Sequence, residues 1–502
     1  MIRHISKRTF LKSAGLAAGA LMIGARSARA TDGWDVIVIG GGTAGLPTAI
    51  FAAERGARVL LIEKSGVLGG TLDRSAGQIA GAGTVFQEAK SIADSADAHF
   101  ADIMRISRGT CDPVLARILA DNAGATINWL AENGFTTRDN HPVIEGAHEA
   151  FSTARYLWGP EGGRSIMKVL VPKTEAAVAA GKITALMHTG AVELTQSSDG
   201  AVTGVITEDA WGARTEHKGR NVVLASGGCA SNPAMFEELH GVPLYARVAY
   251  PYSQGKGIAL GVSAGGVVRG GEKYLCNSGT VLLDNNFPSP IFASAATDPR
   301  SRQPWEIIVN RKGERFVRED HPSVDAREHA LLKQPGMRSW LIFDQEILDK
   351  APPLLPSVTP DRLPGLFNTH PMFTRADTLA GLAKATSIGP EALVQSVANY
   401  NVGQAKGADV FGRTHLPLPI AKPPFYAVAQ QGMTIISFAG LTVDEHLRVT
   451  DEDGAPIPNL YAVGEVIGAG ATSGNAYTNG MLVTPALTFG RLLGQRILPL
   501  AT

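Results

Sequence analysis

The stretch 35-DVIVIGGGTAGLPTAIFAAERGARVLLIEK-64 decides the fold of this chain. An apolar strand at 35–39 leads into the turn 40–45, which has the pattern G-x-G-x-x-G, and a helix is expected over 46–55. A second strand, 58–62, ends at Glu63. Glycines in such a turn let the backbone approach a pyrophosphate at the helix N-terminus, and an acid after the second strand is placed to bind a ribose hydroxyl. The stretch therefore predicts a Rossmann-like α/β fold that binds a dinucleotide.

Later segments distinguish between the possible dinucleotides. Gly69-Gly70-Thr71 follows the first unit of the fold, and a second glycine-rich turn, 225-ASGG-228, follows an apolar strand. Near the end of the chain, the strand 460–463 leads into Gly464-Glu465, a pattern typical of the second cofactor contact in FAD proteins. A nicotinamide site would need no such element so far downstream. The sequence therefore favours FAD.

On these motifs the chain resembles the FAD-dependent fumarate reductase and succinate dehydrogenase flavoprotein superfamily, to which the 3-ketosteroid Δ1-dehydrogenases also belong. The resemblance covers residues 34–498, and its further markers are Val309-Asn310-x-x-Gly313-x-Arg315-Phe316, Pro423-Pro424-Phe425-Tyr426-Ala427 and Gly440-Leu441. It implies a Rossmann-like FAD-binding domain split by an α+β capping domain that holds the substrate. The implied bounds are 31–240 and 361–502 for the two parts of the FAD-binding domain and 241–360 for the cap.

The resemblance also implies how FAD is held. The last helix, expected over 482–497, should point its N-terminus at the flavin ring, where a helix end stabilises negative charge. The superfamily attaches FAD covalently through a His near Gly69-Gly70, but Thr71 takes that place here, so we predict non-covalent FAD. The residues expected to contact FAD are Gly40, Gly42, Thr43, Ala44, Gly45, Glu63, Lys64, Gly69, Gly70, Thr71, Ser75, Gly77, Gln78, Ala191, Val192, Ser226, Gly227, Gly228, Gly464, Glu465, Leu482 and Val483.

The resemblance implies hydride transfer between the flavin and a carbon beside an activating group. Cations with which fumarate reductases act on a dicarboxylate are replaced here, one of them by Ser323 and another by Tyr477. Tyr477 and Gly480 instead resemble the pair with which ketosteroid dehydrogenases hold a ketone oxygen. Serine alone is a poor base, so His321 or Asp325 would have to assist Ser323. The predicted catalytic residues are Tyr477, Gly480, Ser323 and His321.

Three functions remain open from the sequence. The favoured one is desaturation of a carbon–carbon bond next to a carbonyl, in a cyclic ketone or steroid-like substrate, with hydride transfer to flavin N5. The second is fumarate-reductase-like reduction of an unsaturated acid with electrons from a periplasmic cytochrome, for which Arg327 lies four residues too late in the sequence. The third is a flavin electron-transfer subunit. The expected partners are a small-molecule substrate and an external electron acceptor or donor, either a cytochrome, a quinone or oxygen.

Residues 1–30 have the composition of an export signal. Basic residues are followed by a mildly apolar run, 14–25, and by Ala28-Arg29-Ala30, which fits a cleavage site. The segment 6-SKRTFLK-12 resembles a twin-arginine signal with Lys in place of the first arginine. The apolar run is too short to span a bilayer, so no stable membrane insertion is expected. Because the twin-arginine route moves folded proteins, we predict a periplasmic protein that already carries FAD when it is exported.

Charge and cysteine content exclude several classes of function. The formal net charge is zero, with 46 basic and 46 acidic residues. Six basic and no acidic residues lie in 1–30, so the remaining chain has 46 − 6 = 40 basic residues and a net charge of about −6. This balance does not favour nucleic acid as a partner. The three cysteines form no CxxC pair, so neither a disulfide framework nor a metal site is predicted.

Overall fold

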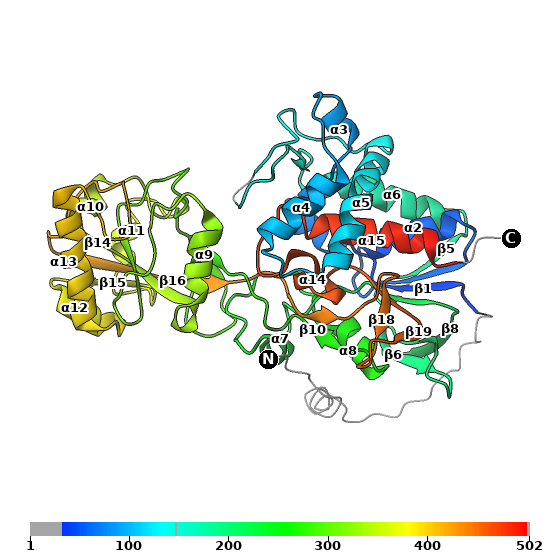
Figure 1. Cartoon of the computed structure of the whole chain (residues 1–502). Coiled ribbons are helices and arrows are strands. Elements are labelled where there is room, and N and C mark those ends of the chain that lie inside the picture. The colour runs from blue at the N-terminus through cyan, green and yellow to red at the C-terminus, as the bar shows by residue number, and fades with distance from the viewer. Residues whose placement is uncertain (1–32, 146–147, 499–502) are drawn as a thin grey trace. The chain divides into compact units, whose positions relative to one another are not determined.

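The computed structural model describes residues 33–145 and 148–498. The predicted export signal, 1–30, therefore lies outside the described residues. The chain divides into two compact units (Figure 1). Among the described residues, the first unit contains 33–145, 148–242, 249–274 and 436–498, and the second contains Pro243–Val248 and Leu275–Ile435. The described helices include no candidate membrane span.

The first unit is built on a six-stranded sheet with the strand order β18-β19-β9-β1-β2-β5. Strands β1 (Val36–Ile39) and β2 (Val59–Ile62) consist of buried aliphatic residues, as expected for parallel strands covered on both faces. β1 pairs in parallel with β2 and with β9 (Val222–Leu224). The other strands are β5 (Ile183–Leu186), β19 (Pro456–Ala462) and β18 (Arg448–Thr450), of which β18 is antiparallel to β19.

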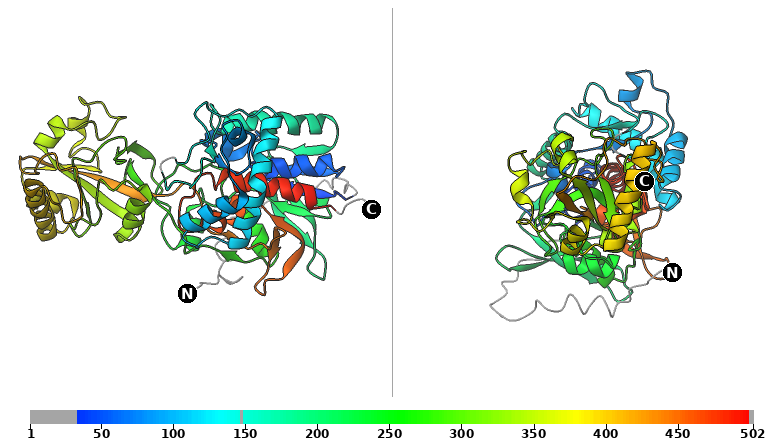
Figure 2. Two further views of the ribbon diagram at one scale, coloured as in Figure 1. Left: turned by 45° about the horizontal axis from the view of Figure 1, so that its top comes forward. Right: turned by 90° about the vertical axis from the view of Figure 1, so that its left-hand side faces the viewer.

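Two helices that are far apart in the sequence pack along one another in this unit. α2 (Gly45–Glu54) begins in the glycine turn, as predicted, and α15 (Val483–Arg496) is the last described helix. Figures 1 and 2 both show α15, in red, beside α2, in blue. The remaining elements are η1 (Gly70–Arg74), β3 (Ile79–Ala80), α3 (Val85–Glu88), α4 (Ala96–Ile106), α5 (Pro113–Glu132), β4 (Tyr156–Leu157), α6 (Gly163–Ala179), β6 (Gly190–Gln196), β7 (Val202–Glu208), β8 (Arg214–Lys218), α7 (Pro233–His240), α8 (Lys256–Ser263), β10 (Val268–Arg269), β17 (Gly440–Leu441), η3 (Glu465–Ile467) and α14 (Gly470–Ser473).

The second unit is an antiparallel sheet with helices. Its strand order is β12-β11-β16-β14-β13, and β15 also pairs with β16. β16 (Phe425–Met433) is buried along its whole length and pairs with every residue of β14 (Arg338–Asp344). A parallel α/β unit together with this α+β unit confirms the predicted fold class. The remaining elements are β11 (Asn277–Leu282), β12 (Ile291–Ser294), β13 (Ile307–Asn310), α9 (Val324–Leu332), η2 (Pro335–Met337), α10 (Gln345–Lys350), α11 (Leu363–Leu366), β15 (Phe373–Ala376), α12 (Leu379–Thr386) and α13 (Pro390–Lys406).

The bounds of the two units differ from the domain bounds predicted above. We expected the chain to return to the FAD-binding domain at residue 361, but it returns at Ile436. The physical reason is β16, which pairs with β11, β14 and β15 and so forms the centre of the second unit's sheet. In addition, Ala249–Tyr274 belongs to the first unit although we expected it in the cap. That the second unit caps a substrate stays a prediction.

Candidate functional site

The sheet of the first unit brings the predicted cofactor residues to one edge. The turn 40–45 follows β1, Glu63 follows β2, the turn 225–228 follows β9, and Gly464-Glu465 follows β19. These four strands are parallel, and each pairs with its neighbour in the sheet. Their carboxyl ends therefore meet at the same edge, which is where open parallel sheets bind ligands.

The glycine turn after β1 is shaped to hold an anion. A Cβ on Gly45 would lie 1.8 Å from the carbonyl oxygen of Gly40, so helix α2 approaches the turn as closely as only glycine permits. The backbone N–H groups of Gly42, Thr43 and Ala44 have no hydrogen-bond partner among the described residues. These donors stand at the N-terminus of α2, where the helix dipole favours negative charge. The turn therefore fits a pyrophosphate.

Glu63 is buried, with 7% of its surface exposed, and the backbone holds its carboxylate in place. One carboxylate oxygen accepts the N–H of Gly41 at 2.7 Å, and the other accepts the N–H of Ser65 at 2.7 Å. Each oxygen keeps a further lone pair for a ribose hydroxyl. The next residue, Lys64, extends its side chain past Gly190 at the start of β6.

The segment 69–71 lies directly against the glycine turn. Gly69 donates its N–H to the carbonyl oxygen of Gly41 at 2.8 Å. A Cβ on Gly70 would lie 3.0 Å from the Cα of Gly42, so two glycine backbones are in contact here. Thr71 follows on the exposed side of η1, where it offers a hydroxyl and no imidazole. These residues fit a cofactor that is held without a covalent bond to Thr71.

The remaining predicted cofactor residues include Ser75, Gln78, Ala191 and Val192. The Oγ of Ser75 accepts the N–H of Gly77 at 3.0 Å, and Gln78 is half-buried just before β3. Ala191 is buried on β6, whereas the side chain of the adjacent Val192 is 39% exposed. Their contacts with FAD stay predictions.

Ser437, which the sequence reasoning missed, ties Glu465 to the second glycine turn. The N–H and hydroxyl of Ser437 donate to Glu465 Oε1 at 2.8 and 3.1 Å, and the N–H of Cys229 donates to Ser437 Oγ at 3.0 Å. A Cβ on Gly228 would lie 2.5 Å from the same carboxylate oxygen. Burial raises the pKa of Glu465, and the hydrogen bonds from Ser437 oppose that change. Ser437 belongs to none of the sequence motifs described above, and its contact with Glu465 is evident only in the folded structure.

The loop between α14 and α15 carries both of the predicted ketone-binding residues. Gly480 has φ of +77°, and a Cβ there would lie 2.6 Å from the backbone nitrogen of Ala80 on β3. Its own N–H has no hydrogen-bond partner in the described part of the chain. Tyr477 is half-buried and stacks on His148, with ring centroids 4.1 Å apart. The loop, 474-GNAYTNGML-482, has no charged side chain.

This loop leads directly to the cofactor edge. Leu482 and Val483 begin α15, as predicted. A Cβ on Gly464 would lie 2.9 Å from the Cβ of Ala44 and 3.9 Å from the Cβ of Ala486, which lies in the first turn of α15. The first unit therefore brings the start of α15, the start of α2 and the turn after β19 together.

The other two predicted catalytic residues, Ser323 and His321, lie in the second unit. Ser323 is the N-cap of α9, and its Oγ accepts the N–H of Ala326 at 3.2 Å. His321 Nδ1 accepts the backbone N–H of Ser323 at 3.1 Å, so this contact is made to the backbone rather than to the hydroxyl. Both interactions support the start of α9, and the predicted proton relay through Ser323 stays a prediction.

Arg327 stands one helical turn beyond Ser323 on α9. Its side chain is 5% exposed, and Nη1 donates to the carbonyl oxygen of Thr297. Nε and Nη2 have no hydrogen-bond partner among the described residues, and the carboxylate of Asp298 lies 3.9 Å from Nη2. Burial lowers the pKa of Arg327, while Asp298 opposes that change. A buried, incompletely paired guanidinium is a suitable partner for an anionic group.

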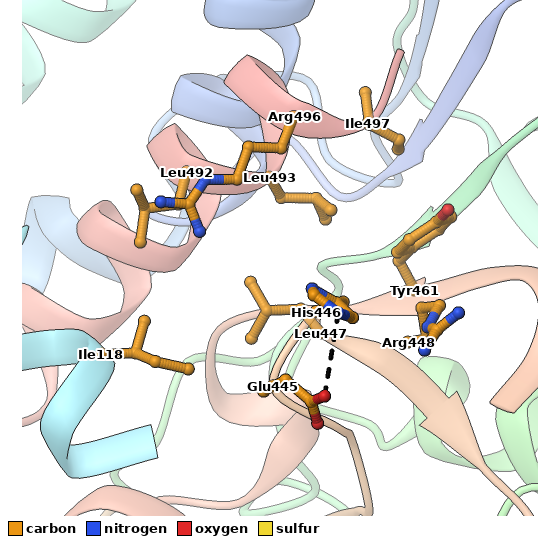
Figure 3. A pocket seen from close by; sticks show the side chains of 10 residues that line it. All are labelled: Ile118, Glu445, His446, Leu447, Arg448, Tyr461, Leu492, Leu493, Arg496 and Ile497. Carbon is orange, nitrogen blue, oxygen red and sulfur yellow. Dashed lines mark ion pairs between the residues drawn. The ribbon is translucent and has the colours of Figure 1, made fainter. Parts of the chain in front are cut away.

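A cavity of about 240 Å³ lies elsewhere in the first unit, between the C-terminal end of α15 and the loop before β18 (Figure 3). In Figure 3, Arg496 extends from α15 on one side and the ion pair of Glu445 and His446 lies on the other. None of the predicted cofactor or catalytic residues lines it, so it is separate from the site described above. The lining residues are Ile118, Glu445, His446, Leu447, Arg448, Tyr461, Leu492, Leu493, Arg496 and Ile497.

Comparison with known proteins gives a match to one family, to two relatives and to one solved structure. The family described as "FAD binding domain" matches residues 35–479. The chain is 28% identical over 463 residues to a fumarate reductase (cytochrome) of Shewanella frigidimarina, covering 92% of this chain and 76% of that protein. It is 29% identical over 480 residues to a urocanate reductase of Eggerthella lenta, covering 93% and 75%. The fold also resembles that of 3-ketosteroid Δ1-dehydrogenase from Sterolibacterium denitrificans, with a TM-score of 0.71 and 22% identity over 93% of this chain and 99% of that one.

Proposed function

Because this chain belongs to the FAD binding domain family, and with it to the fumarate reductase and succinate dehydrogenase flavoprotein superfamily, we propose that it reduces a carbon–carbon double bond conjugated to an uncharged carbonyl group. FAD is its cofactor, and the protein is an FAD-dependent oxidoreductase that acts on a CH–CH bond. The superfamily and the cofactor predicted from the sequence are thereby confirmed.

The neutral loop 474–482 is the observation that carries the proposal. It carries the hydroxyl of Tyr477 next to the start of α15, and its sequence contains no cation. It also carries the backbone N–H of Gly480, which donates to no described residue. Hydroxyl and N–H donors suit a carbonyl oxygen on which negative charge develops during the reaction. A carboxylate is better held by Arg in bidentate geometry. The loop therefore favours an enone or a similar uncharged acceptor over a dicarboxylate.

The residues named here would serve the reaction in either direction. Bound flavin would supply the hydride in its reduced form, or accept it in its oxidised form in the reverse reaction, while one proton is added to or removed from the neighbouring carbon. Tyr477 and Gly480 would stabilise the same enolate-like charge whether the double bond is being formed or reduced, so the loop selects the substrate rather than the direction. Both relatives named above are reductases, which favours reduction. Desaturation of the saturated ketone, the reaction favoured by the sequence, is the reverse reaction at the same site.

Reduction of an unsaturated carboxylic acid is the second candidate, and Arg327 favours it. This guanidinium is buried in the second unit, and its Nε and Nη2 make no hydrogen bond to any described residue. Both relatives named above are called reductases of compounds that carry carboxylates, fumarate and urocanate. In this candidate, Arg327 takes the place that the sequence spacing assigned to Ser323.

Export and electron supply complete the proposal. Residues 1–30 support export along a twin-arginine-type route, with the FAD already bound and the protein released into the periplasm. An external donor, either a cytochrome or a quinone, would then reduce the flavin. The small molecule that is reduced and this electron donor are the two partners that the proposal requires.

Flavin reoxidation by a panel of compounds tests the substrate class. Dithionite-reduced protein is mixed anaerobically with cyclohex-2-enone, acrylate or fumarate in a stopped-flow spectrometer, and recovery of oxidised-flavin absorbance is followed. We expect cyclohex-2-enone to reoxidise the flavin fastest, because the neutral loop has donors for a carbonyl and no cation for a carboxylate. Faster reoxidation by acrylate or fumarate, abolished in Arg327→Met, would reject the enone proposal and establish the second candidate.

Acid precipitation tests the mode of FAD attachment. We expect all of the flavin to remain in solution when the purified protein is precipitated with acid, because Thr71 offers no imidazole for a covalent bond. The measurement is the flavin absorbance of supernatant and pellet. Non-covalent contacts hold no flavin in a denatured chain, so flavin in the washed pellet would mean a covalent bond.

A further inference from the structure

We infer that His148 is a positioning residue for Tyr477. The loop that carries His148 holds its ring against the phenol ring and is itself hydrogen-bonded to the rest of the first unit at two points. This inference rests on the proposed role of Tyr477. The two rings are stacked, with centroids 4.1 Å apart and planes inclined by 28°. Stacking of this kind is a favourable aromatic geometry, and it restricts the rotation of the tyrosine side chain. It therefore fixes the direction in which the Tyr477 hydroxyl points.

The loop that carries His148 is bonded to the loop that carries Tyr477. Asn479 donates from Nδ2 to the carbonyl oxygen of Glu149 at 3.0 Å. Glu149 directly follows His148, and Asn479 lies two residues after Tyr477. The stacked rings and this hydrogen bond therefore connect the same two segments at adjacent points, so that neither segment can slide without breaking both contacts.

Hydrogen bonds to helix α4 hold the other end of the same loop. Ser152 donates its N–H and its hydroxyl to Asp102 Oδ2 at 2.8 and 2.7 Å. Arg105, one turn further along α4, donates from Nη2 to the carbonyl oxygen of Ala150 at 2.7 Å. The loop is thus held from the helix side by three hydrogen bonds, all of which involve a charged group and are therefore stronger than neutral ones.

A buried arginine, Arg155, holds the carboxylate of Asp102 in place. Arg155 is fully buried and pairs with Asp102 and with Asp94, to which it donates two bonds at 2.7 and 2.9 Å. Burial would raise the pKa of Asp102, but the hydrogen bonds from Ser152 and Arg105 outweigh it and hold that pKa below its ordinary value. Asp102 therefore stays ionised at neutral pH and keeps both bonds from Ser152. Such a network is costly to open, because opening it leaves charges buried without partners.

This arrangement separates the two tasks of the site. Tyr477 supplies the hydroxyl, and His148 supplies the surface against which its ring is held. A hydrogen-bond donor that is aimed in advance stabilises developing charge better than one that must first be oriented. Loss of His148 should therefore slow hydride transfer at saturating substrate and leave the KM for cyclohex-2-enone nearly unchanged.

Two variants at His148 test this on the FAD-loaded full-length protein. His148→Ala removes the stacked ring, and His148→Phe keeps an aromatic ring without the imidazole nitrogens. Fluorine NMR of 3-fluorotyrosine placed at position 477 reports the position of the ring without any substrate. We expect His148→Ala to shift and broaden this signal and to lower the reoxidation rate with cyclohex-2-enone about three- to tenfold. His148→Phe should return the signal towards its original position and restore most of the rate.

The controls make failure of the inference distinguishable from failure of the proposed function. His446→Ala removes a histidine whose side chain is 63% exposed and that lines the separate cavity, so it should change neither readout. An unchanged fluorine signal in His148→Ala, or a signal that His148→Phe fails to restore, would overturn the positioning role. If the signal behaves as expected but Tyr477→Phe leaves the reoxidation rate unchanged, the proposed role of Tyr477 fails instead.

Discussion

Gly45→Ala is expected to yield a protein that purifies without FAD and unfolds at a lower temperature. A Cβ at this position would lie 1.8 Å from the carbonyl oxygen of Gly40, and that atom belongs to the backbone and cannot rotate away. Helix α2 would have to move off the turn, which would displace the N–H groups that fit the pyrophosphate. Overpacking of this kind typically costs about 1–3 kcal/mol, and the backbone clash places this variant at the upper end. The measurements are the flavin-to-protein absorbance ratio and thermal unfolding with and without added FAD.

Two other glycines serve as matched controls for this variant. A Cβ on Gly365 would meet no described atom within 4 Å, and its φ lies outside the left-handed region, so Gly365→Ala should retain full FAD content and stability. A Cβ on Gly42 would meet only the Cα of Gly70 among the described atoms, at the ordinary distance of 3.8 Å. Gly42→Ala should therefore keep its fold, and a selective loss of FAD in it would locate the cofactor at the turn. Full FAD content in Gly45→Ala would contradict our interpretation of the close approach of α2.

The cofactor edge could be predicted from the sequence because each of its parts is local. β1 and β2 are short runs of four aliphatic residues, and the turn between β1 and α2 requires glycine at fixed positions. Once the strands are taken as parallel, their carboxyl ends must lie at one edge, and Glu63 and Glu465 follow from that rule. The fold class and FAD are confirmed for this reason.

The extent of the second unit could not be predicted, because it depends on strand pairing over long distances. β16 pairs with β14 and β11, which precede it by many tens of residues. Nothing within the sequence 425-FYAVAQQGM-433 indicates which strands it pairs with. The predicted boundary at 361 therefore leaves this nine-residue segment on the wrong side. Only the sheet shows where the chain returns to the first unit.

Motif spacing alone does not settle the choice between Ser323 and Arg327, because the two residues lie one helical turn apart at the start of α9. Counting residues along the chain selects Ser323, but α9 begins at Val324, and Ser323 uses its Oγ to cap that helix. From there the chain follows a helix, so the buried cation is Arg327, one turn further on. No sequence motif indicates His148 or Ser437, because each makes its contact with a residue that is distant in sequence, Tyr477 and Glu465 respectively.

Tyr477→Phe is expected to lower the rate of flavin reoxidation by cyclohex-2-enone about a hundredfold or more. The substitution removes one hydroxyl and keeps the ring, so the stacking on His148 and the fold should remain. Removal of one donor to an oxygen that gains negative charge typically costs about 10²–10³ in rate, which corresponds to roughly 2.7–4 kcal/mol. The measurement is the limiting reoxidation rate at saturating enone in stopped-flow experiments, with FAD content determined for each preparation.

Tyr461→Phe is the matched control, because it removes a tyrosine hydroxyl of the same unit from the wall of the separate cavity. It should keep the full rate, whereas a loss equal to that of Tyr477→Phe would indicate a general effect of such changes on the fold. If the reoxidation rate of Tyr477→Phe fell by less than about threefold, the hydroxyl of Tyr477 would not be bonded to the reacting carbonyl. The N–H of Gly480 would then be the other proposed donor to the carbonyl, and the neutral loop would act mainly by excluding carboxylates. Reoxidation by acrylate, which needs no such donor pair in the second candidate, should be insensitive to Tyr477→Phe in either case.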